Sequence, residues 1–252
     1  IMTNSKTQFT IQELLDSNNN LLFDLDGTLL PMNMDYFLEK YFVALGSHFS
    51  SQVNTKKFIE SLLQATGSMI KNDGELTNKE VFTKEFFKML PELNQQKALD
   101  TFDEFYRQKF PSLGDNINKD PQTVKVIEIL KSNNKNLILA TNPVFPMEAV
   151  ESRLKWIGLS ADHFDLITCY SNMHYCKPNP EYYQEILDKM ELDPKSSLMI
   201  GNDELEDMIA GELGIDKILI KDNLKESEQG YEPDWQGSRA EFYREVRNWS
   251  RR

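Results

Sequence analysis

Two aspartates one residue apart, Asp24 and Asp26, end a short apolar run and are followed by Gly27-Thr28. The run is short and bounded by a turn signal, which predicts a buried strand rather than a helix. Side chains alternate along a strand, so both carboxylates point to the same side. Two carboxylates this close repel each other unless a cation or a shared proton relieves them. The pair therefore suits a magnesium ion and acid/base chemistry.

Further polar side chains follow later apolar runs of the chain. Right-handed crossovers place every strand-to-helix loop of a parallel sheet on one edge, the carboxyl edge, where ligands bind. The residues that we expect to meet the aspartates there are Thr141, Asn142, Lys177, Asp203 and Asp207. Hydroxyl, amide and ammonium groups can hold phosphate oxygens, and carboxylates can hold Mg²⁺.

The elements that must position these residues follow from the apolar pattern. Strands are predicted near 20–24, 137–140, 166–168, 198–200 and 217–220. Helices are predicted from Asp120-Pro121, Pro146 and Asn179-Pro180, and over residues 204–213. Strands that alternate with helices predict an α/β fold with a doubly wound parallel sheet. The polar segment from Asp222 is expected to wrap the surface.

Residues 31–111 interrupt this alternation, because their apolar residues recur at helical spacing and predict four helices with no strand. The gap from Asp26 to Thr141 is 115 residues, far more than one helical crossover needs. We therefore expect two domains: an α/β catalytic core made of residues 1–30 and 112–252, and an all-α insertion over residues 31–111.

Composition limits the classes of partner. A formal net charge of -12 disfavours nucleic acid, although a metal ion and lysines can still attract a small anion. No apolar run is long enough to cross a membrane, and the polar segment Thr3–Gln12 lacks the apolar block of a signal peptide. Cys169 and Cys176 match no metal or redox spacing, which favours a reduced, cytoplasmic protein.

The order of these motifs resembles the haloacid dehalogenase-like superfamily of phosphohydrolases. The segment from Asp24 to Thr28 is similar to the first motif of that superfamily, Thr141 to the second, and Lys177 before Pro178 to the third. The acidic fourth motif corresponds to residues 201–207. The resemblance implies a Rossmann-like core, and it implies that the helical insertion is a cap that excludes water and selects the substrate.

The resemblance also implies roles for individual residues. Asp24 would be the nucleophile that forms an aspartyl-phosphate, and Asp26 would protonate the leaving oxygen and then activate water. Thr141, Asn142 and Lys177 would bind the phosphoryl group. Asn142 also has a structural explanation, because it precedes a proline.

Magnesium is the cofactor that the resemblance implies. The carboxylates of Asp24 and Asp203 and the backbone carbonyl of Asp26 would hold the ion, and Asp207 would support the site indirectly or through Lys177. One departure matters: Asn202 stands directly after Gly201, where the family usually has aspartate. We align Asp203 with the family's acidic residue because it keeps a four-residue spacing to Asp207. The other register would place Asn202 at the metal.

The function expected from these observations is a magnesium-dependent phosphatase that acts on a small phosphorylated metabolite, as a monomer or homodimer. The same aspartyl-phosphate would also serve a phosphomutase or phosphotransferase. A binding protein on a catalytically weak scaffold is a third hypothesis, which Asn202 alone supports. No nucleic-acid or membrane partner is expected.

Overall fold

A six-stranded parallel sheet forms the centre of the protein, for which a computed structural model describes residues 9–252. Most of the polar segment Thr3–Gln12 lies outside the described residues. The strands are β1 (Asn20–Phe23), β2 (Asn136–Leu139), β3 (Leu166–Ile167), β4 (Ser197–Gly201), β5 (Asp216–Ile220) and β6 (Trp235–Gly237). Their order, β3-β2-β1-β4-β5-β6, and their parallel pairing confirm the predicted doubly wound fold.

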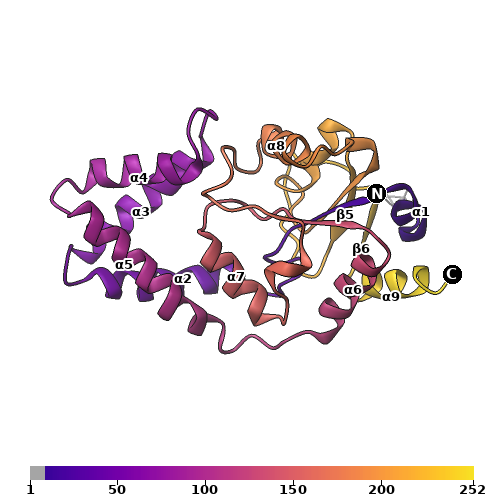
Figure 1. Cartoon of the computed structure of the whole chain (residues 1–252), viewed down its shortest axis with the longest axis horizontal. Coiled ribbons are helices and arrows are strands. Elements are labelled where there is room, and N and C mark those ends of the chain that lie inside the picture. Colours follow the sequence, from indigo (N-terminus) through magenta and orange to yellow (C-terminus); the bar gives the residue numbers. More distant parts are fainter. Residues whose placement is uncertain (1–8) are drawn as a thin grey trace.

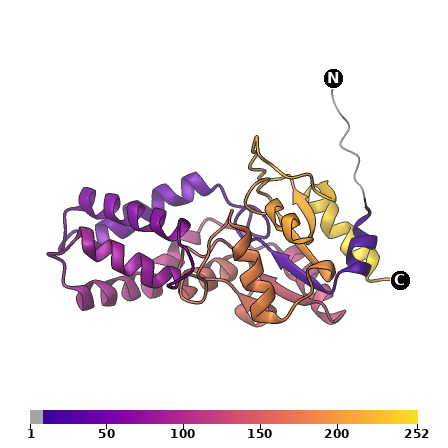
Figure 2. The ribbon, with the colours of Figure 1, turned by 90° about the horizontal axis from the view of Figure 1, so that it is seen from above.

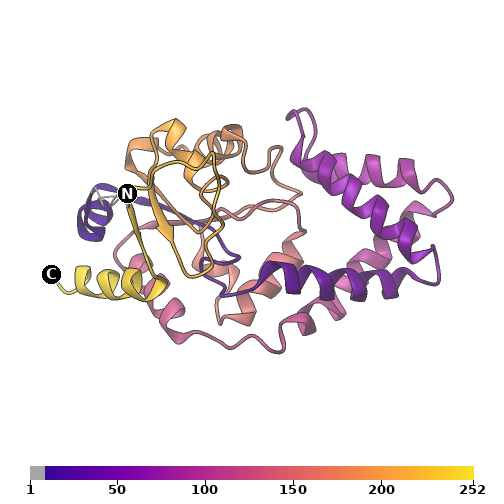
Figure 3. The same cartoon turned by 180° about the vertical axis from the view of Figure 1, so that it is seen from behind.

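Helices cover both faces of this sheet (Figure 3). They are α1 (Ile11–Ser17), α6 (Pro121–Ser132), α7 (Met147–Trp156), α8 (Pro180–Met190) and α9 (Arg239–Trp249). Leu21 and Phe23 of β1 belong to the large core cluster, which also contains residues of α1, α6, α7 and α9. Leu22 belongs to a second cluster with α8. Because neighbouring residues of a strand face opposite ways, one short apolar run fills both layers.

Four α-helices lie within residues 31–111, as predicted, and gather at one end of the molecule (Figures 1 and 2). They are α2 (Met34–Phe49), α3 (Thr55–Ile70), α4 (Asn78–Met89) and α5 (Gln95–Gln108), followed by the 3₁₀ helix η1 (Phe110–Gly114). Thr77 and Glu80 form a capping box at the start of α4, which supplies partners to free amides of the first turn. The division into a core and a cap domain stays a prediction.

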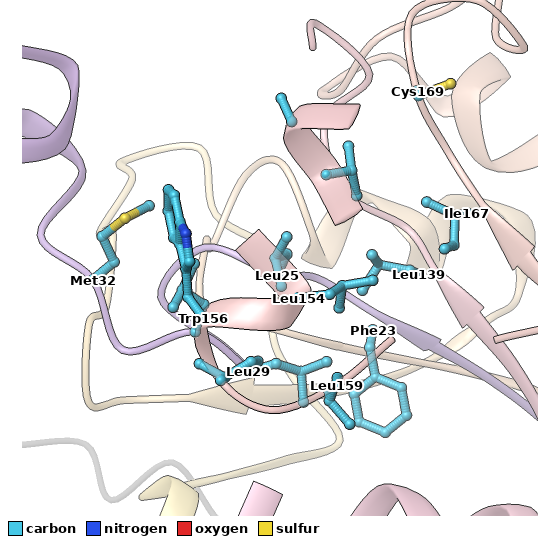
Figure 4. Packing of buried hydrophobic residues seen from close by; sticks show 14 of the residues in the cluster. Phe23, Leu25, Leu29, Met32, Leu139, Leu154, Trp156, Leu159, Ile167 and Cys169 are labelled. Atoms are coloured by element: carbon cyan, nitrogen blue, oxygen red, sulfur yellow. The ribbon is translucent and has the colours of Figure 1, made fainter. Parts of the chain in front are cut away.

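Aromatic packing joins this helical block to the sheet layer. The ring of Trp156, on α7, stacks on Phe110 with centroids 5.6 Å apart and meets Phe37 of α2 edge-on at 5.9 Å. Figure 4 shows Trp156 and Leu154 beside Leu25, which follows β1. One apolar cluster thus runs from the sheet into the helical block, so α2 is anchored close to the carboxyl edge of β1.

Four features differ from the sequence-based expectations. The predicted helix over 204–213 is a turn followed by the 3₁₀ helix η4 (Met208–Leu213). The polar C-terminal segment does not merely wrap the surface, since β6 adds an edge strand to the sheet and α9 buries Phe242, Tyr243 and Val246. The short helix α1 was not predicted either.

No described helix has the length and apolar content needed to cross a bilayer.

Candidate active site

The carboxyl edge of the sheet borders a cavity of about 260 Å³. Six of the seven predicted site residues line it: Asp24, Asp26, Thr141, Asn142, Asp203 and Asp207. The seventh, Lys177, is joined to Asp24 by an ion pair. The strand order turns back between β1 and β4, and a crevice forms at such a point in doubly wound sheets. The topology therefore brings together loops that lie far apart in the sequence.

Asp24 lies directly after β1 and is 9 % exposed. Its carboxylate accepts hydrogen bonds from Lys177 Nζ at 3.0 Å and from Thr28 Oγ1 at 3.3 Å. Burial raises the pKa of Asp24 to about 7; Lys177 opposes this rise, and the carboxylates of Asp207 and Asp26 add to it. A positive charge brought into the cavity would favour the ionised form of this carboxyl group.

Lys177 is completely buried and bridges two carboxylates. Its Nζ donates to Asp207 at 2.6 Å as well as to Asp24. Burial alone would lower the pKa of Lys177, but the Asp207 and Asp24 carboxylates raise it well above its ordinary value. The lysine is therefore a fixed cation, which holds the Asp24 side chain in one position.

Asp207 also organises the loop that follows β4. One of its carboxylate oxygens accepts hydrogen bonds from the backbone amides of Asn202 (2.9 Å) and Asp203 (3.0 Å). Gly201 permits this approach, because a Cβ there would lie 2.1 Å from the Asp207 carboxylate. Asp203 in turn accepts from the amides of Leu205 and Glu206, and its second oxygen lies 3.7 Å from Lys225 Nζ.

Asn202 is 2 % exposed, and both ends of its amide have partners. Its Oδ1 accepts a hydrogen bond from Thr28 Oγ1 at 2.9 Å, and its Nδ2 donates to the carbonyl of Asn223 at 2.6 Å. Gly27, with φ +97°, leaves room for this side chain, since a Cβ there would lie 2.4 Å from Nδ2. Thr28 thus links Asn202 to Asp24.

Arg153, on α7, is a site residue that the sequence reasoning missed. It is 1 % exposed, forms an ion pair with Asp26 and stands 4.7 Å from the centroid of the Phe145 ring. Among the described residues, one oxygen of Asp26 and one terminal nitrogen of Arg153 (Nη2) are buried without a hydrogen-bond partner. An arginine on the buried face of an amphipathic helix was the available signal, because arginine is seldom buried unless it is paired.

Asn142 and Glu206 occupy the side of the cavity next to Lys177. Asn142 Nδ2 donates to the Lys177 carbonyl (3.4 Å) and to Glu206 (3.3 Å), whereas its Oδ1 is buried with no partner in the described chain. Glu206 also lines the cavity, and burial raises its pKa. The Thr141 carbonyl accepts from Thr168 and Tyr182, which fixes the end of β2.

The donors around the cavity fit a magnesium ion. Five carboxyl groups border it, against Arg153 and Lys225 in the lining and Lys177 behind Asp24, so the formal charge of the site is negative. In the described part of the chain, no three acidic, histidine or cysteine side chains converge into a closed metal cage. Magnesium commonly takes one or two carboxylates and completes its shell with water and substrate phosphate, so an open acidic site suffices.

One family model matches most of this chain. The sequence model of the haloacid dehalogenase-like hydrolases matches residues 19–213. Pyrophosphatase PpaX of Bacillus mycoides (strain KBAB4) is 24 % identical over 220 residues, which are 86 % of this chain and 91 % of that protein.

Solved structures share the fold at low sequence identity. A 2-haloacid dehalogenase from Pseudomonas syringae pv. Tomato DC3000 superposes with a TM-score of 0.64 at 19 % identity, covering 92 % of this chain and 99 % of that one. A HAD phosphatase from Thermococcus onnurineus gives 0.56 at 19 % identity, covering 90 % and 96 %.

Proposed function

This chain belongs to the haloacid dehalogenase-like hydrolases, and from that membership we propose that it is a magnesium-dependent phosphatase of a small phosphorylated metabolite. One observation carries the proposal: the buried Asp24 carboxylate borders the cavity and is held by Lys177 and Thr28. A carboxylate fixed in this way can attack phosphorus. Phosphoryl transfer depends mainly on such positioning and on neutralisation of charge.

The proposed reaction has two steps. Asp24 attacks the phosphorus while the ester P–O bond breaks, and the departing alcohol oxygen takes a proton from Asp26, which gives an aspartyl-phosphate. Asp26 then takes a proton from the water that attacks the phosphorus, the bond to Asp24 breaks, and inorganic phosphate leaves. Both aspartates return to their starting states.

The surrounding side chains support these steps electrostatically. Lys177 orients Asp24, and we assign the binding of phosphoryl oxygens to Thr141 and Asn142, which line the cavity with Asp24. Arg153 has a nitrogen without a partner among the described residues, so it can bind a phosphoryl oxygen beside Asp26. A magnesium ion held by Asp24, Asp203 and the backbone carbonyl of Asp26 would neutralise charge on the phosphoryl oxygens.

The proposal is tested by phosphate release from a broad panel of phosphate esters. We expect turnover with Mg²⁺, loss of turnover with EDTA, and a fall of at least about a thousandfold in Asp24→Asn. Asp162→Asn, at an exposed position outside the cavity, is the matched control and should keep full activity. The proposal would be disproved if the native protein released phosphate from none of the esters and the Asp24→Asn variant did not differ from it in any of these assays.

Two other outcomes separate the remaining alternatives. Isomerised product without free phosphate would indicate a phosphomutase. Tight binding of magnesium and a phosphate mimic without turnover would indicate a binding protein.

A further inference from the structure

The lining of the active-site cavity is divided by polarity. Its charged side chains all come from α7 and from segments that follow β1, β4 and β5: Asp24, Asp26, Arg153, Asp203, Glu206, Asp207 and Lys225. The rest of the lining, apart from Thr141, Asn142 and Asn202, is a wall without charge, which we call the uncharged wall. It consists of Met34, Leu38, Tyr41, Phe42, Leu62, Leu63, Thr66, Val144 and Phe145, from α2, α3 and the loop after β2.

The two hydroxyl groups of the uncharged wall are already engaged. Tyr41 Oη shares a buried hydrogen bond of 2.7 Å with Tyr106 Oη, and its ring lies edge-on to Phe145 at 5.5 Å. Thr66 Oγ1 donates to the Leu62 carbonyl within α3 at 2.9 Å. The wall therefore presents rings, methyl groups and one thioether to the cavity.

This chemistry discriminates between kinds of phosphate ester. A sugar, a nucleoside or a second phosphate placed against the uncharged wall would give up hydrogen bonds to water and gain few in return, because each hydroxyl of the wall already has a partner. An alkyl or aryl group would gain free energy from each methylene removed from water. We propose that the alcohol part of the substrate is apolar and lies against the uncharged wall, with its phosphoryl group beside Asp24. This inference rests on the proposed phosphatase function.

A second cavity lies on the other side of part of the uncharged wall. Tyr41, Leu62, Thr66 and Val144 also line a second cavity of about 570 Å³, which is bordered by α3, α4 and α5. Its lining combines apolar side chains with charged and amide ones: Phe82, Leu99 and Phe102 on one hand, and Lys79, Glu80, Lys84, Gln95, Gln96 and Asp103 on the other. The first cavity, of about 260 Å³, is therefore the space in which we expect the alkyl group to lie.

The test is a homologous series of alkyl phosphates from methyl to hexyl, assayed with Mg²⁺ beside phenyl phosphate, glucose 6-phosphate, AMP and pyrophosphate. We expect kcat/KM to rise about fourfold with each methylene and to exceed the values for the three polar substrates. If the polar substrates are hydrolysed faster than hexyl phosphate, the apolar-substrate inference is wrong while the phosphatase proposal stands.

If no ester is turned over, the phosphatase proposal is wrong. The apolar-substrate inference can then still be tested with alkylphosphonates. These compounds cannot be hydrolysed, and titration calorimetry gives their affinities directly. The affinity should rise with chain length from methyl- to hexylphosphonate. An affinity that does not depend on chain length would overturn the inference, whatever the activity of the protein.

A substitution in the uncharged wall tests whether this wall causes the preference for longer alkyl chains. Leu38→Gln should lower kcat/KM for hexyl phosphate at least tenfold more than for methyl phosphate, whereas Leu38→Met should retain the native preference. Val43→Gln lies on the same helix but is 69 % exposed and outside the cavity, so it should change neither value. An equal fall for both esters in Leu38→Gln, with unchanged thermal unfolding, would contradict the placement of the alkyl group.

Discussion

Arg153 and Asp26 are 127 residues apart in the sequence, form an ion pair and line the cavity at the carboxyl edge of the sheet. The guanidinium comes from α7 and the carboxylate from the loop after β1, so the pair ties the helix after β2 to the first motif. The Arg153–Asp26 pair can be buried because each charge compensates the other, and because the Arg153 guanidinium also lies over the Phe145 ring.

Removal of one partner of this pair should destabilise the protein. Arg153→Met leaves the Asp26 carboxylate in the cavity without its cation, and we expect the free energy of unfolding to fall by about 3 kcal/mol. Urea denaturation followed by circular dichroism measures this change, and Arg251→Met, at an exposed position, is the control. The double variant with Asp26→Asn should lose less than the sum of the two single variants. Strict additivity would show that the pair does not couple energetically.

Substitution of Asp203 should weaken the response to magnesium. In Asp203→Asn one charged oxygen donor is lost, so we expect the Mg²⁺ concentration for half-maximal activity to rise at least about tenfold. A titration of activity against Mg²⁺ measures the change, with the exposed Glu228→Gln as the control. A native magnesium requirement in Asp203→Asn, together with tighter magnesium binding in Asn202→Asp, would assign the metal position to residue 202.

Glu185 should contribute stability that depends on pH. It accepts hydrogen bonds from the His174 ring (2.7 Å) and amide (2.9 Å) and pairs with Lys189 at 3.2 Å. Burial opposes ionisation of Glu185, but these partners outweigh it and hold the pKa below its ordinary value of 4.5. The folded state thus binds this proton less readily than the unfolded chain, so the stabilisation is complete above about pH 4.5 and is lost as the pH falls through the lowered pKa.

The corresponding experiment compares Glu185→Gln with the native protein by urea denaturation at several pH values. We expect a loss of about 1–2 kcal/mol at pH 7 that shrinks as the pH falls below 4.5 and through the lowered pKa of Glu185. Glu181→Gln, at an exposed position on the same helix, is the control. A loss of the same size at every pH would mean that the packing of Glu185, rather than its charge, stabilises the loop before Lys177.

The thiol of Cys176 should resist alkylation in the folded protein. The residue is 1 % exposed, and burial raises its pKa to about 12, so the reactive thiolate is scarce at pH 8. Cys169 is equally buried. Mass spectrometry after iodoacetamide treatment should find both cysteines unmodified in buffer and both alkylated in 6 M guanidinium chloride. Rapid labelling of Cys176 in buffer would show that the loop before Lys177 opens readily.

The sequence alone determined the parallel α/β sheet, the helical insertion and the carboxylate pair after β1. These features depend on neighbouring residues: the apolar run before Asp24, the capping residues at helix starts and the spacing of apolar side chains. Such local patterns predict the same helices and strands independently of how distant parts of the chain pack. The strand β6 escaped prediction because it has only three residues, and α9 because charged residues obscure its apolar face.

Only the tertiary structure decided which charges meet. Nothing near Arg153 in the sequence indicates Asp26 as its partner, and nothing near Asn202 indicates Thr28. The uncharged wall is likewise a property of the folded chain, because α2 and α3 line the cavity with Asp24 through contacts between distant segments, such as the packing of Trp156 on Phe37. Contacts between distant segments depend on how the layers of helices and strands pack on one another, and a local sequence pattern does not predict that packing.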